Sequence, residues 1–306
     1  MRFLLLPLLA FATAFPAQAQ TNKTYPPEIE GAEVYVYRTV GDVKLNAYVF
    51  GAVDKAETPR PAVVFFFGGG WTNGSPTQFE QHCRYLASRG MVAITCDYRV
   101  LSRHGTPAKA CVTDAKAAIR WVRANAVKLG VDPDRIAAGG GSAGGHLAAC
   151  TGVIDGFEPE GDNSKISSRP NAMILYNPAL VLAPFGDDNP ALKSREAELS
   201  ERMGVAAKAL SPIHHVQASE PPTIIFHGEA DTTVPFATAR DFTTVMKKAG
   251  NRCELKAYPG AGHGFFNAGR AGNKAFLSTL NETDEFLKSL GWLTGPATVD
   301  TFFPHS

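Results

Sequence analysis

The chain has 306 residues, of which 44% are hydrophobic and 19% are charged, and its formal net charge at pH 7 is +1. This balance is that of an ordinary globular protein and excludes a disordered or strongly basic chain. Acidic and basic residues are mixed along the sequence, without a basic cluster dense enough to indicate nucleic-acid or membrane-surface binding. We therefore expect neither nucleic acid nor, after removal of the leader, a membrane among its partners.

The first residues have the pattern of a leader. Arg2 supplies a positive charge, and the apolar run over residues 3–15 is too short to span a bilayer comfortably. Small residues at Ala17 and Ala19 then mark a cleavage site. The pattern predicts a signal peptide over residues 1–19, with an uncleaved anchor as the alternative, and a secreted or periplasmic protein whose mature part, 20–306, is a single domain.

The N-terminal part of the mature chain predicts a β-hairpin. The stretches "AEVYVYRTV" and "VKLNAYVF" alternate apolar and polar residues on either side of a turn at Gly41 and Asp42. Six short, mostly continuous apolar runs follow, as expected for parallel strands covered on both faces. These runs are "AVVFFF", "MVAITCDY", "RIAAG", "NAMILYN", "PTIIFHG" and "CELKAY".

Helix-like stretches separate the apolar runs, at residues 77–89, 107–129, 143–152, 236–249 and 274–290. This alternation predicts one doubly wound, mostly parallel α/β sheet that begins with an antiparallel hairpin. Residues 178–220 interrupt the rhythm, because no strand is evident there and the middle of the segment is helix-like. We interpret this segment as a small lid inserted between two strands; the alternative is a long surface connection without a role.

The segment "RIAAGGGSAGGHLAA" fits two motifs. Gly139, Gly141 and Gly144 have the Gly-x-Gly-x-x-Gly spacing of a dinucleotide-binding turn, whereas Gly140, Ser142 and Gly144 have the Gly-x-Ser-x-Gly spacing of a nucleophile elbow. The dinucleotide motif requires an acidic residue at the end of the next strand, and here the acidic residues lie in a polar, loop-like stretch. The Gly-Lys-Ser/Thr of a phosphate-binding loop is also missing. We therefore favour the nucleophile elbow and expect no cofactor and no metal.

A nucleophilic serine requires a base and an acidic residue that orients the base. In α/β-hydrolases these follow in the order serine, acid, histidine, each on a loop after a late strand. Here Asp231 follows the strand in "PTIIFHGEADTTVP", and His263 lies in a glycine-flanked loop after the next strand. The predicted triad is Ser142, Asp231 and His263, with Glu229 as the competing acid.

A second triple-glycine run, in "VVFFFGGGWTNG", follows the first parallel strand. Glycines there allow backbone N–H groups to approach an oxyanion without obstruction. We expect the amides of Gly69, Gly70 and Ala143 to form the oxyanion hole. We also expect the elbow to hold Ser142 in a strained conformation, with glycines on either side because strand and helix approach closely.

With these features the chain resembles α/β-hydrolases of the esterase/lipase group, which includes hormone-sensitive-lipase-like enzymes and bacterial acetyl and feruloyl xylan esterases. The resemblance covers nearly the whole mature length, through "CDYRV", "PAKACVTDAKAAIRWV" and "VDPDRIAAGGGSAGG". It favours Asp231 over Glu229, because "DTTVP" matches the group's Asp-x-x-Val-Pro pattern. Two features depart from it: Phe67 stands where the group usually has histidine, and a long N-terminal helical cap is missing.

The resemblance implies a secreted serine esterase that acts on short acyl esters, particularly O-acetyl groups of polysaccharides. Because much of residues 178–220 is charged, we expect no long apolar groove for a lipid chain. The alternatives are a prolyl-oligopeptidase-like peptidase, against which the missing propeller counts, a lipase of the same fold, and a non-catalytic binding protein. The acyl group, the alcohol and the oligomeric state are not readable from the sequence.

Several further polar and aromatic residues have open roles. Trp71 follows the oxyanion glycines, where it either stacks on a sugar or simply packs, and His104 either borders the site or lies on an ordinary surface loop. We interpret His146, His214, His215, His227 and Asp114 as packing or supporting residues. None of the five cysteines lies in a Cys-x-x-Cys pair, and an oxidising compartment would permit one or two disulfide bridges among Cys83, Cys96, Cys111, Cys150 and Cys253.

Overall fold

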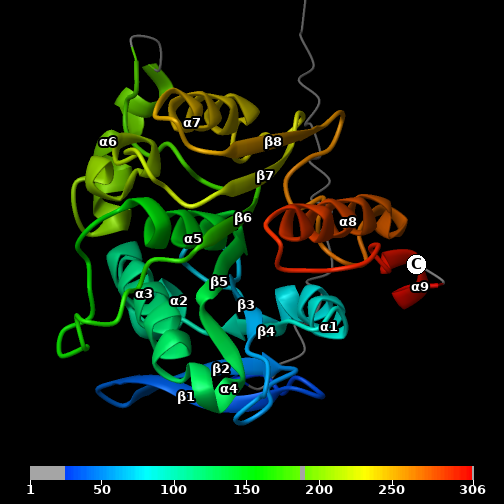
Figure 1. Cartoon of the computed structure of the whole chain (residues 1–306). Helices are drawn as coiled ribbons and strands as arrows, with labels where there is room; N and C mark the ends of the chain where they lie inside the picture. The colour runs from blue at the N-terminus through cyan, green and yellow to red at the C-terminus, as the bar shows by residue number, and fades with distance from the viewer. Residues whose placement is uncertain (1–24, 187–189, 305–306) are drawn as a thin grey trace, which may run out of the picture.

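A computed structural model of the protein describes residues 25–186 and 190–304. The predicted signal peptide and three residues of the predicted lid, 187–189, lie outside the described residues. Eight strands form one sheet in the order β1-β2-β4-β3-β5-β6-β7-β8, with helices on both faces (Figure 1). This is the predicted doubly wound α/β fold.

The sheet begins with the predicted antiparallel hairpin. β1 (Glu33–Val40) and β2 (Val43–Phe50) are joined at Gly41, and β2 continues antiparallel onto β4 (Val92–Cys96). β1 lies at the edge of the sheet, where Tyr37 is buried whereas the apolar Val34 and Val36 are exposed.

All other strand pairs are parallel, and their residues are largely buried. Because the carboxyl ends of parallel strands share one edge of the sheet, the loops that follow these strands meet there. With β4, the parallel strands are β3 (Arg60–Phe66), β5 (Val131–Gly141), β6 (Ala172–Tyr176), β7 (Thr223–Gly228) and β8 (Cys253–Tyr258).

The helices bury two separate apolar clusters, one on each face of the sheet (Figure 1). One face carries α3 (Ala108–Ala124), α4 (Ala126–Leu129), α5 (Ala143–Val153) and α7 (Phe236–Lys248). The opposite face carries η1 (Pro76–Phe79), α1 (Glu80–Ser88), η4 (Ala271–Asn273), α8 (Lys274–Ser289) and α9 (Val299–Phe302).

The helices differ from the sequence-based expectation in two places. The helix expected over residues 107–129 is divided at Asn125, whose side-chain amide donates to the Trp121 carbonyl and ends the first part. The short helices α2 (Leu101–His104) and α9 were not expected, because a single turn is too short to show a helical period.

The segment between β6 and β7 is helical, as predicted. It contains α6 (Pro190–Met203), η2 (Ala207–Leu210) and η3 (Pro212–His214). Its beginning, residues 179–183, is buried and apolar, and Leu199 of α6 is buried as well. The segment therefore packs on the α3/α5 face of the domain through apolar side chains.

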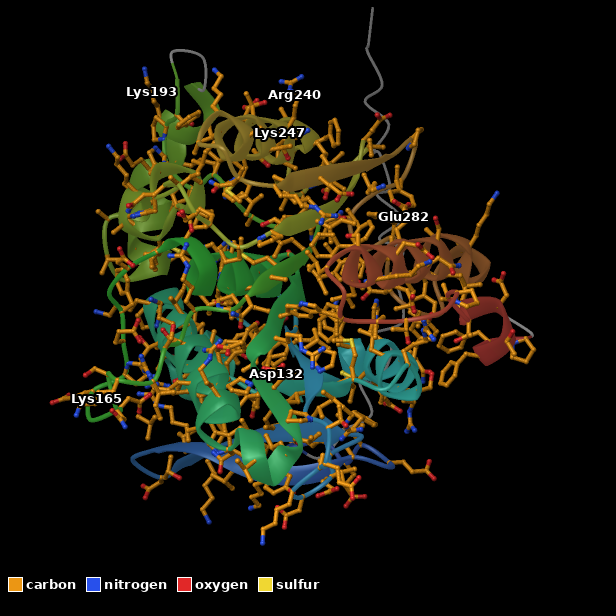
Figure 2. The ribbon with its side chains drawn as sticks, viewed as in Figure 1. Asp132, Lys165, Lys193, Arg240, Lys247 and Glu282 are labelled. Carbon is orange, nitrogen blue, oxygen red and sulfur yellow. The ribbon has the colours of Figure 1, made fainter. Side chains whose placement is uncertain are left out.

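The surface is charged and the thiols are internal. Lys165, Lys193 and Arg240 are exposed and point outward at the edge of the molecule (Figure 2). All five cysteines are buried and free, so the structure contains none of the disulfide bridges that the sequence permitted. Within the described chain, no helix is long and apolar enough to span a membrane.

Candidate active site

Ser142 lies at the turn between β5 and α5 with φ 54° and ψ −117°, a strained conformation for a residue other than glycine. Its amide donates to the Tyr176 carbonyl at 2.8 Å, which ties the turn to β6. A Cβ atom on Gly144 would lie 1.9 Å from the Phe66 carbonyl oxygen, and one on Gly140 would lie 2.5 Å from the Gly144 backbone. The two glycines are therefore needed for the close approach of helix and strand, as predicted.

Ser142 begins a chain of hydrogen bonds through His263 to Asp231. His263 Nε2 lies 2.9 Å from Ser142 Oγ, and His263 Nδ1 lies 2.7 Å from Asp231 Oδ2. Because a carboxylate only accepts, Nδ1 carries the proton and Nε2 is left to accept from the serine hydroxyl. The structure thus brings together the three residues of the predicted triad. Glu229, the competing acid, is exposed at the start of the same loop.

The Asp231 carboxylate is buried and fully hydrogen-bonded. Two backbone amides of the following turn donate to Oδ1 at 2.8 and 2.9 Å, and Asn177 Nδ2 donates to Oδ2 at 2.6 Å. Burial raises the pKa of Asp231, but hydrogen bonds with His227, His263 and the Val234 amide outweigh it and hold the pKa well below the usual range. His227 Nε2 also lies 2.8 Å from the Val234 carbonyl, so His227 supports the acid loop as predicted.

Asn177 is a residue of the site that the sequence interpretation missed. It follows β6 directly and has φ 42°. Its backbone N–H donates to the Phe226 carbonyl at 2.8 Å. Its side chain thereby contacts Asp231 from the neighbouring loop. The sequence signal that could have identified Asn177 is its place as a polar residue at the carboxyl end of a buried parallel strand.

Gln78 is a second missed residue, and it connects two loops of the site. Its Oε1 accepts from the Gly68 amide at 2.6 Å, and its Nε2 donates to Asn267 Oδ1 at 2.9 Å. Asn267 in turn donates to the Gly264 carbonyl beside His263 at 2.8 Å. No local pattern marks Gln78, because Asn267 lies 189 residues away in the sequence.

The glycine loop after β3 faces the elbow. Gly69 and Gly70 have φ of +124° and +62°, conformations that favour glycine, and a Cβ atom on Gly69 would lie 2.3 Å from the Asn73 carbonyl oxygen. Gly70 and Ala143 border the same cavity as Ser142. Ala143 is the first residue of α5, so its amide has no partner in a preceding helical turn.

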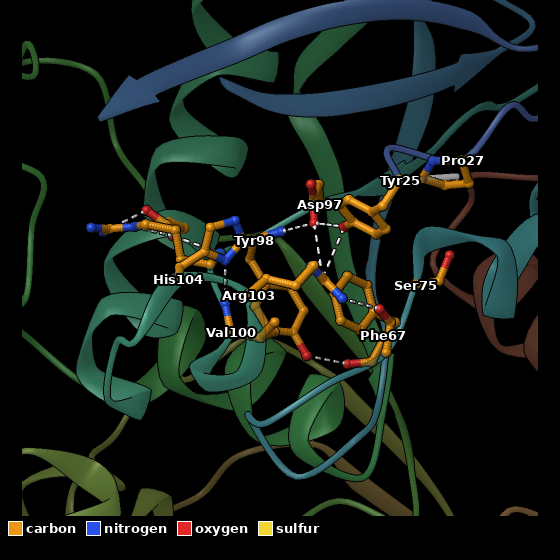
Figure 3. Close-up of polar contacts among 12 residues, drawn as sticks. Tyr25, Pro27, Phe67, Ser75, Asp97, Tyr98, Val100, Arg103 and His104 are labelled. Carbon is orange, nitrogen blue, oxygen red and sulfur yellow. Dashed lines mark hydrogen bonds and ion pairs between the residues drawn. The ribbon is translucent and has the colours of Figure 1, made fainter. Parts of the chain in front are cut away.

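Aromatic and charged side chains contact the two ends of this glycine loop (Figure 3). The Tyr98 hydroxyl donates to the Phe67 carbonyl at 2.7 Å, and the two rings stack with centroids 4.0 Å apart. Arg103 donates to the Gly74 carbonyl at 2.9 Å, at the other end of the loop. Phe67, which replaces the histidine usual in the group, thus acts as a packing residue.

Arg103 belongs to a polar cluster with the buried Asp97 and the exposed Tyr25 (Figure 3). Asp97 accepts from the Tyr25 hydroxyl and, at 2.8 Å, from the Tyr98 amide. Burial raises the pKa of Asp97 to about 6, although the hydrogen bond from Tyr25 and the charge of Arg103 act in the opposite direction.

The cavity at Ser142 has a volume of about 420 Å³. The inserted segment supplies an apolar part of the cavity wall, through residues that lie before and within α6. The expectation that it forms no long apolar groove stays a prediction. The apolar lining residues from this segment are Ala179, Val181, Leu182, Phe185 and Leu199, and the charged lining residues of the cavity are Arg195, Arg202 and Asp241.

The two tentative substrate contacts lie in different surroundings. Trp71 borders the cavity, but its ring is buried, donates through Nε1 to His146 Nδ1 at 3.1 Å, and has the Arg202 guanidinium 5.2 Å from its centroid. The structure thus favours the packing interpretation of Trp71. His104 Nδ1 accepts from the Val100 amide within its own turn, and His104 is not among the residues that line the cavity.

The remaining candidates are internal supports, as predicted. His146 is fully buried and donates to the Leu210 carbonyl at 2.7 Å, and burial lowers its pKa to about 4. Asp114 is paired with Arg99 at 2.8 Å and with Arg38 at 3.2 Å. His214 lies 3.0 Å from the Pro184 carbonyl, and His215 lies 3.0 Å from the Lys208 carbonyl. Among the described residues, no three His, Cys, Asp or Glu side chains gather closely enough to hold a metal ion.

The order of the strands and the serine turn directly after the central β5 are those of an α/β-hydrolase. The chain belongs to the BD-FAE family, whose sequence model matches residues 52–246. The model of the dienelactone hydrolase family matches residues 204–291.

The chain is similar to known esterases. Esterase LipC of Mycobacterium tuberculosis is 31% identical over 229 residues, which are 69% of this chain and 55% of LipC. Carboxylesterase NlhH of the same species is 40% identical over 130 residues, which are 40% of this chain and 39% of NlhH. The chain spans about half the length of the curated relatives that it matches over most of its own length.

A solved structure covers more of the chain. Native esterase 2 of Thermogutta terrifontis has a TM-score of 0.84 and 53% identity, and the match covers 89% of this chain and 97% of that one. The same enzyme with bound butyrate has a TM-score of 0.84 and 54% identity, with 89% and 99% covered.

Proposed function

We propose that the protein is a serine carboxylesterase. The observation that carries the proposal is the hydrogen-bonded chain from Ser142 Oγ through His263 to the buried Asp231 carboxylate. The similarity to esterases, at 53% identity over nearly the whole of a solved one, supports it. A non-catalytic protein on this fold would have no need to keep these three residues, and this chain has all of them.

In the proposed mechanism, His263 Nε2 takes the proton of Ser142 Oγ as that oxygen attacks the ester carbonyl. The amides of Gly69, Gly70 and Ala143 stabilise the oxyanion, while Asp231 stabilises the imidazolium and keeps its Nδ1–H in place. His263 then donates the proton to the leaving alcohol. Water, activated by the same histidine, releases the acid and restores the serine.

We propose short acyl esters as the substrates. The cavity of about 420 Å³ at Ser142 is lined by apolar side chains and also by charged side chains, which a long alkyl chain would desolvate. Thermogutta terrifontis esterase 2 has been solved with propionate and with butyrate, which are acids of this length. O-acetyl groups of polysaccharides are the finer proposal, supported by the resemblance to xylan esterases.

A substrate panel tests this proposal. We expect release of acetate from acetylated xylan and turnover of p-nitrophenyl acetate, and no cleavage of prolyl peptide amides. Turnover of the small ester without release from xylan would restrict the substrate to small esters. Cleavage of the peptide amide at a rate comparable to that of the ester would favour the peptidase alternative.

We further propose that the protein is exported, on the pattern of residues 1–19. N-terminal sequencing of protein purified from the medium or periplasm should begin near residue 20. A cytoplasmic protein that retains residue 1 would contradict the proposal.

A further inference from the structure

Arg202 of α6 extends from the inserted segment to the glycine loop. Its Nη2 donates to the Gly70 carbonyl at 2.7 Å, and its guanidinium lies 5.2 Å from the centroid of the Trp71 ring. Arg202 also borders the cavity that contains Ser142. A permanently charged side chain of one segment thus contacts two successive residues of another, beside the nucleophile.

The inserted segment contacts the glycine loop a second time. Trp71 Nε1 donates to His146 Nδ1 at 3.1 Å, and His146 Nε2 donates to the Leu210 carbonyl at 2.7 Å. Leu210 ends η2 of the same inserted segment. The peptides that follow the oxyanion glycines are therefore linked to the segment on two sides, through Arg202 and through His146.

The glycine loop needs such support because it has few side chains of its own. Gly69 and Gly70 both have positive φ, and neither carries a side chain that could fix its orientation. A Cβ atom on Gly70 would lie only 2.6 Å from Arg202 Nη2, so the guanidinium packs directly against the bare backbone. A bond from a cation to a peptide carbonyl is among the stronger hydrogen bonds in proteins.

We infer that Arg202 is a positioning residue for the oxyanion hole. By binding the Gly70 carbonyl and covering Trp71, it holds the Gly69 and Gly70 amides in the orientation in which they face the reacting carbonyl oxygen. The hole is then complete only while α6 is in place, so that substrate enclosure and transition-state stabilisation are coupled. This inference rests on the proposed esterase function.

The test compares Arg202→Met with Lys193→Met. Both variants remove one positive charge from α6, but Lys193 is exposed and points away from the domain (Figure 2). For Arg202→Met we expect kcat to fall roughly 10- to 50-fold, less than the 10²–10³ typical of losing an oxyanion donor, with KM within about threefold. The factor should be the same for acetyl and butyryl esters. Lys193→Met should retain the parent kcat.

Three further measurements separate positioning from a general loss of structure. The rate of inactivation by a fluorophosphonate should fall in parallel with kcat, because the phosphonyl oxygen occupies the same hole. Guanidinium ion at non-denaturing concentration should restore part of the activity of Arg202→Ala, in which the space of the side chain is vacant, and should leave the activity of Lys193→Met unchanged. Arg202→Lys should lie between parent and Arg202→Met, because an ammonium group can donate to the Gly70 carbonyl but cannot cover the ring equally well.

The outcomes distinguish the inference from the function on which it rests. If the parent neither turns over esters nor reacts with the fluorophosphonate at Ser142, the esterase proposal is wrong. If the parent is active and Arg202→Met matches it in kcat, the positioning role is wrong. It is equally wrong if the loss occurs only in KM, or if guanidinium restores nothing.

Discussion

Ser142 has a backbone conformation with positive φ, which costs a residue other than glycine about 1–3 kcal/mol. The conformation persists because β5 and α5 are held close together through Gly140 and Gly144, where no side chain would fit. It places Oγ above the sheet edge, within 2.9 Å of His263 Nε2. The strain is therefore explained by the position that the hydroxyl must reach.

Replacement of Ser142 by alanine removes the attacking oxygen and little else. We expect Ser142→Ala to fold as the parent does and to lose roughly 10⁴- to 10⁶-fold in kcat. Measurements of p-nitrophenyl acetate hydrolysis and of far-UV circular dichroism check both parts. Hydrolysis by the variant at near the parent rate would contradict the assignment of Ser142 as the nucleophile.

The acid of the site can be tested with two amide substitutions in one loop. Asp231→Asn should lower kcat by roughly 10⁴-fold, because an amide no longer stabilises the imidazolium or selects its tautomer. Glu229→Gln, at an exposed position, is the matched control and should stay within about tenfold of the parent. A large loss confined to Glu229→Gln would reverse the assignment.

At the scale of elements, the segment between β6 and β7 has two distinct parts. Its beginning, residues 179–183, is buried and supplies part of an apolar wall, whereas most of α6 is exposed. Among the residues of α6 whose side chains the structure describes, Leu199 is the buried apolar one that borders the cavity. The segment thus encloses a small cavity and also presents a charged outer face.

This enclosure predicts the preferred chain length. Each buried methylene contributes about 0.8 kcal/mol, so kcat/KM should rise while the acyl chain extends along the apolar wall. It should fall once the acyl chain is too long for the cavity and desolvates the charged side chains that line it, and we expect a maximum between acetyl and butyryl and a steep decrease by octanoyl. A series of p-nitrophenyl esters measures it. A maximum at octanoyl or beyond would indicate a longer apolar channel and a lipase.

At the scale of the whole molecule, two buried histidines link stability to pH. His82 lies among aromatic rings, and neither of its nitrogens has a hydrogen-bond partner among the described residues. Burial lowers the pKa of His82 to about 3 and that of His146 to about 4, from an ordinary value of 6.5. The unfolded chain therefore binds more protons than the folded one below pH 6.5, so these residues stabilise the fold above that pH and lose this contribution as the pH falls.

Asp97 acts in the opposite direction, because its pKa is raised and the folded state binds its proton more readily. The two histidines outweigh the one carboxyl group. We expect the free energy of unfolding to fall by roughly 1–2 kcal/mol per pH unit between pH 6.5 and about 4. Urea denaturation at a series of pH values measures this slope.

The variant His82→Phe isolates one contribution. A phenyl ring suits the aromatic surroundings and leaves no buried nitrogen unpaired, so stability at neutral pH should be equal or higher. The acid slope should become shallower by roughly 1.4 kcal/mol per pH unit. An unchanged slope would show that His82 does not carry the proton linkage.

The features that the sequence by itself determined are those that depend on neighbours within a few residues. Apolar runs separated by helical stretches predicted the α/β fold, and the glycines around Ser142 predicted the elbow. Asp231 and His263 were identifiable because each lies on a loop directly after a late strand. In each case a local backbone requirement dictates the residue type, so the pattern is visible in the letters.

Only the tertiary structure decided which distant residues meet. Gln78 connects loops 189 residues apart, and Arg202 contacts Gly70 across 132 residues, and neither contact leaves a local pattern. The apolar wall also depended on packing: residues 179–185 are an apolar run in the sequence, but only the fold places them beside Ser142. The sequence likewise left open whether Trp71 stacks on a sugar or packs in the core. The fold decides for packing, because His146 and Arg202 lie around its ring. Such contacts depend on how whole elements pack, and the sheet order sets that packing.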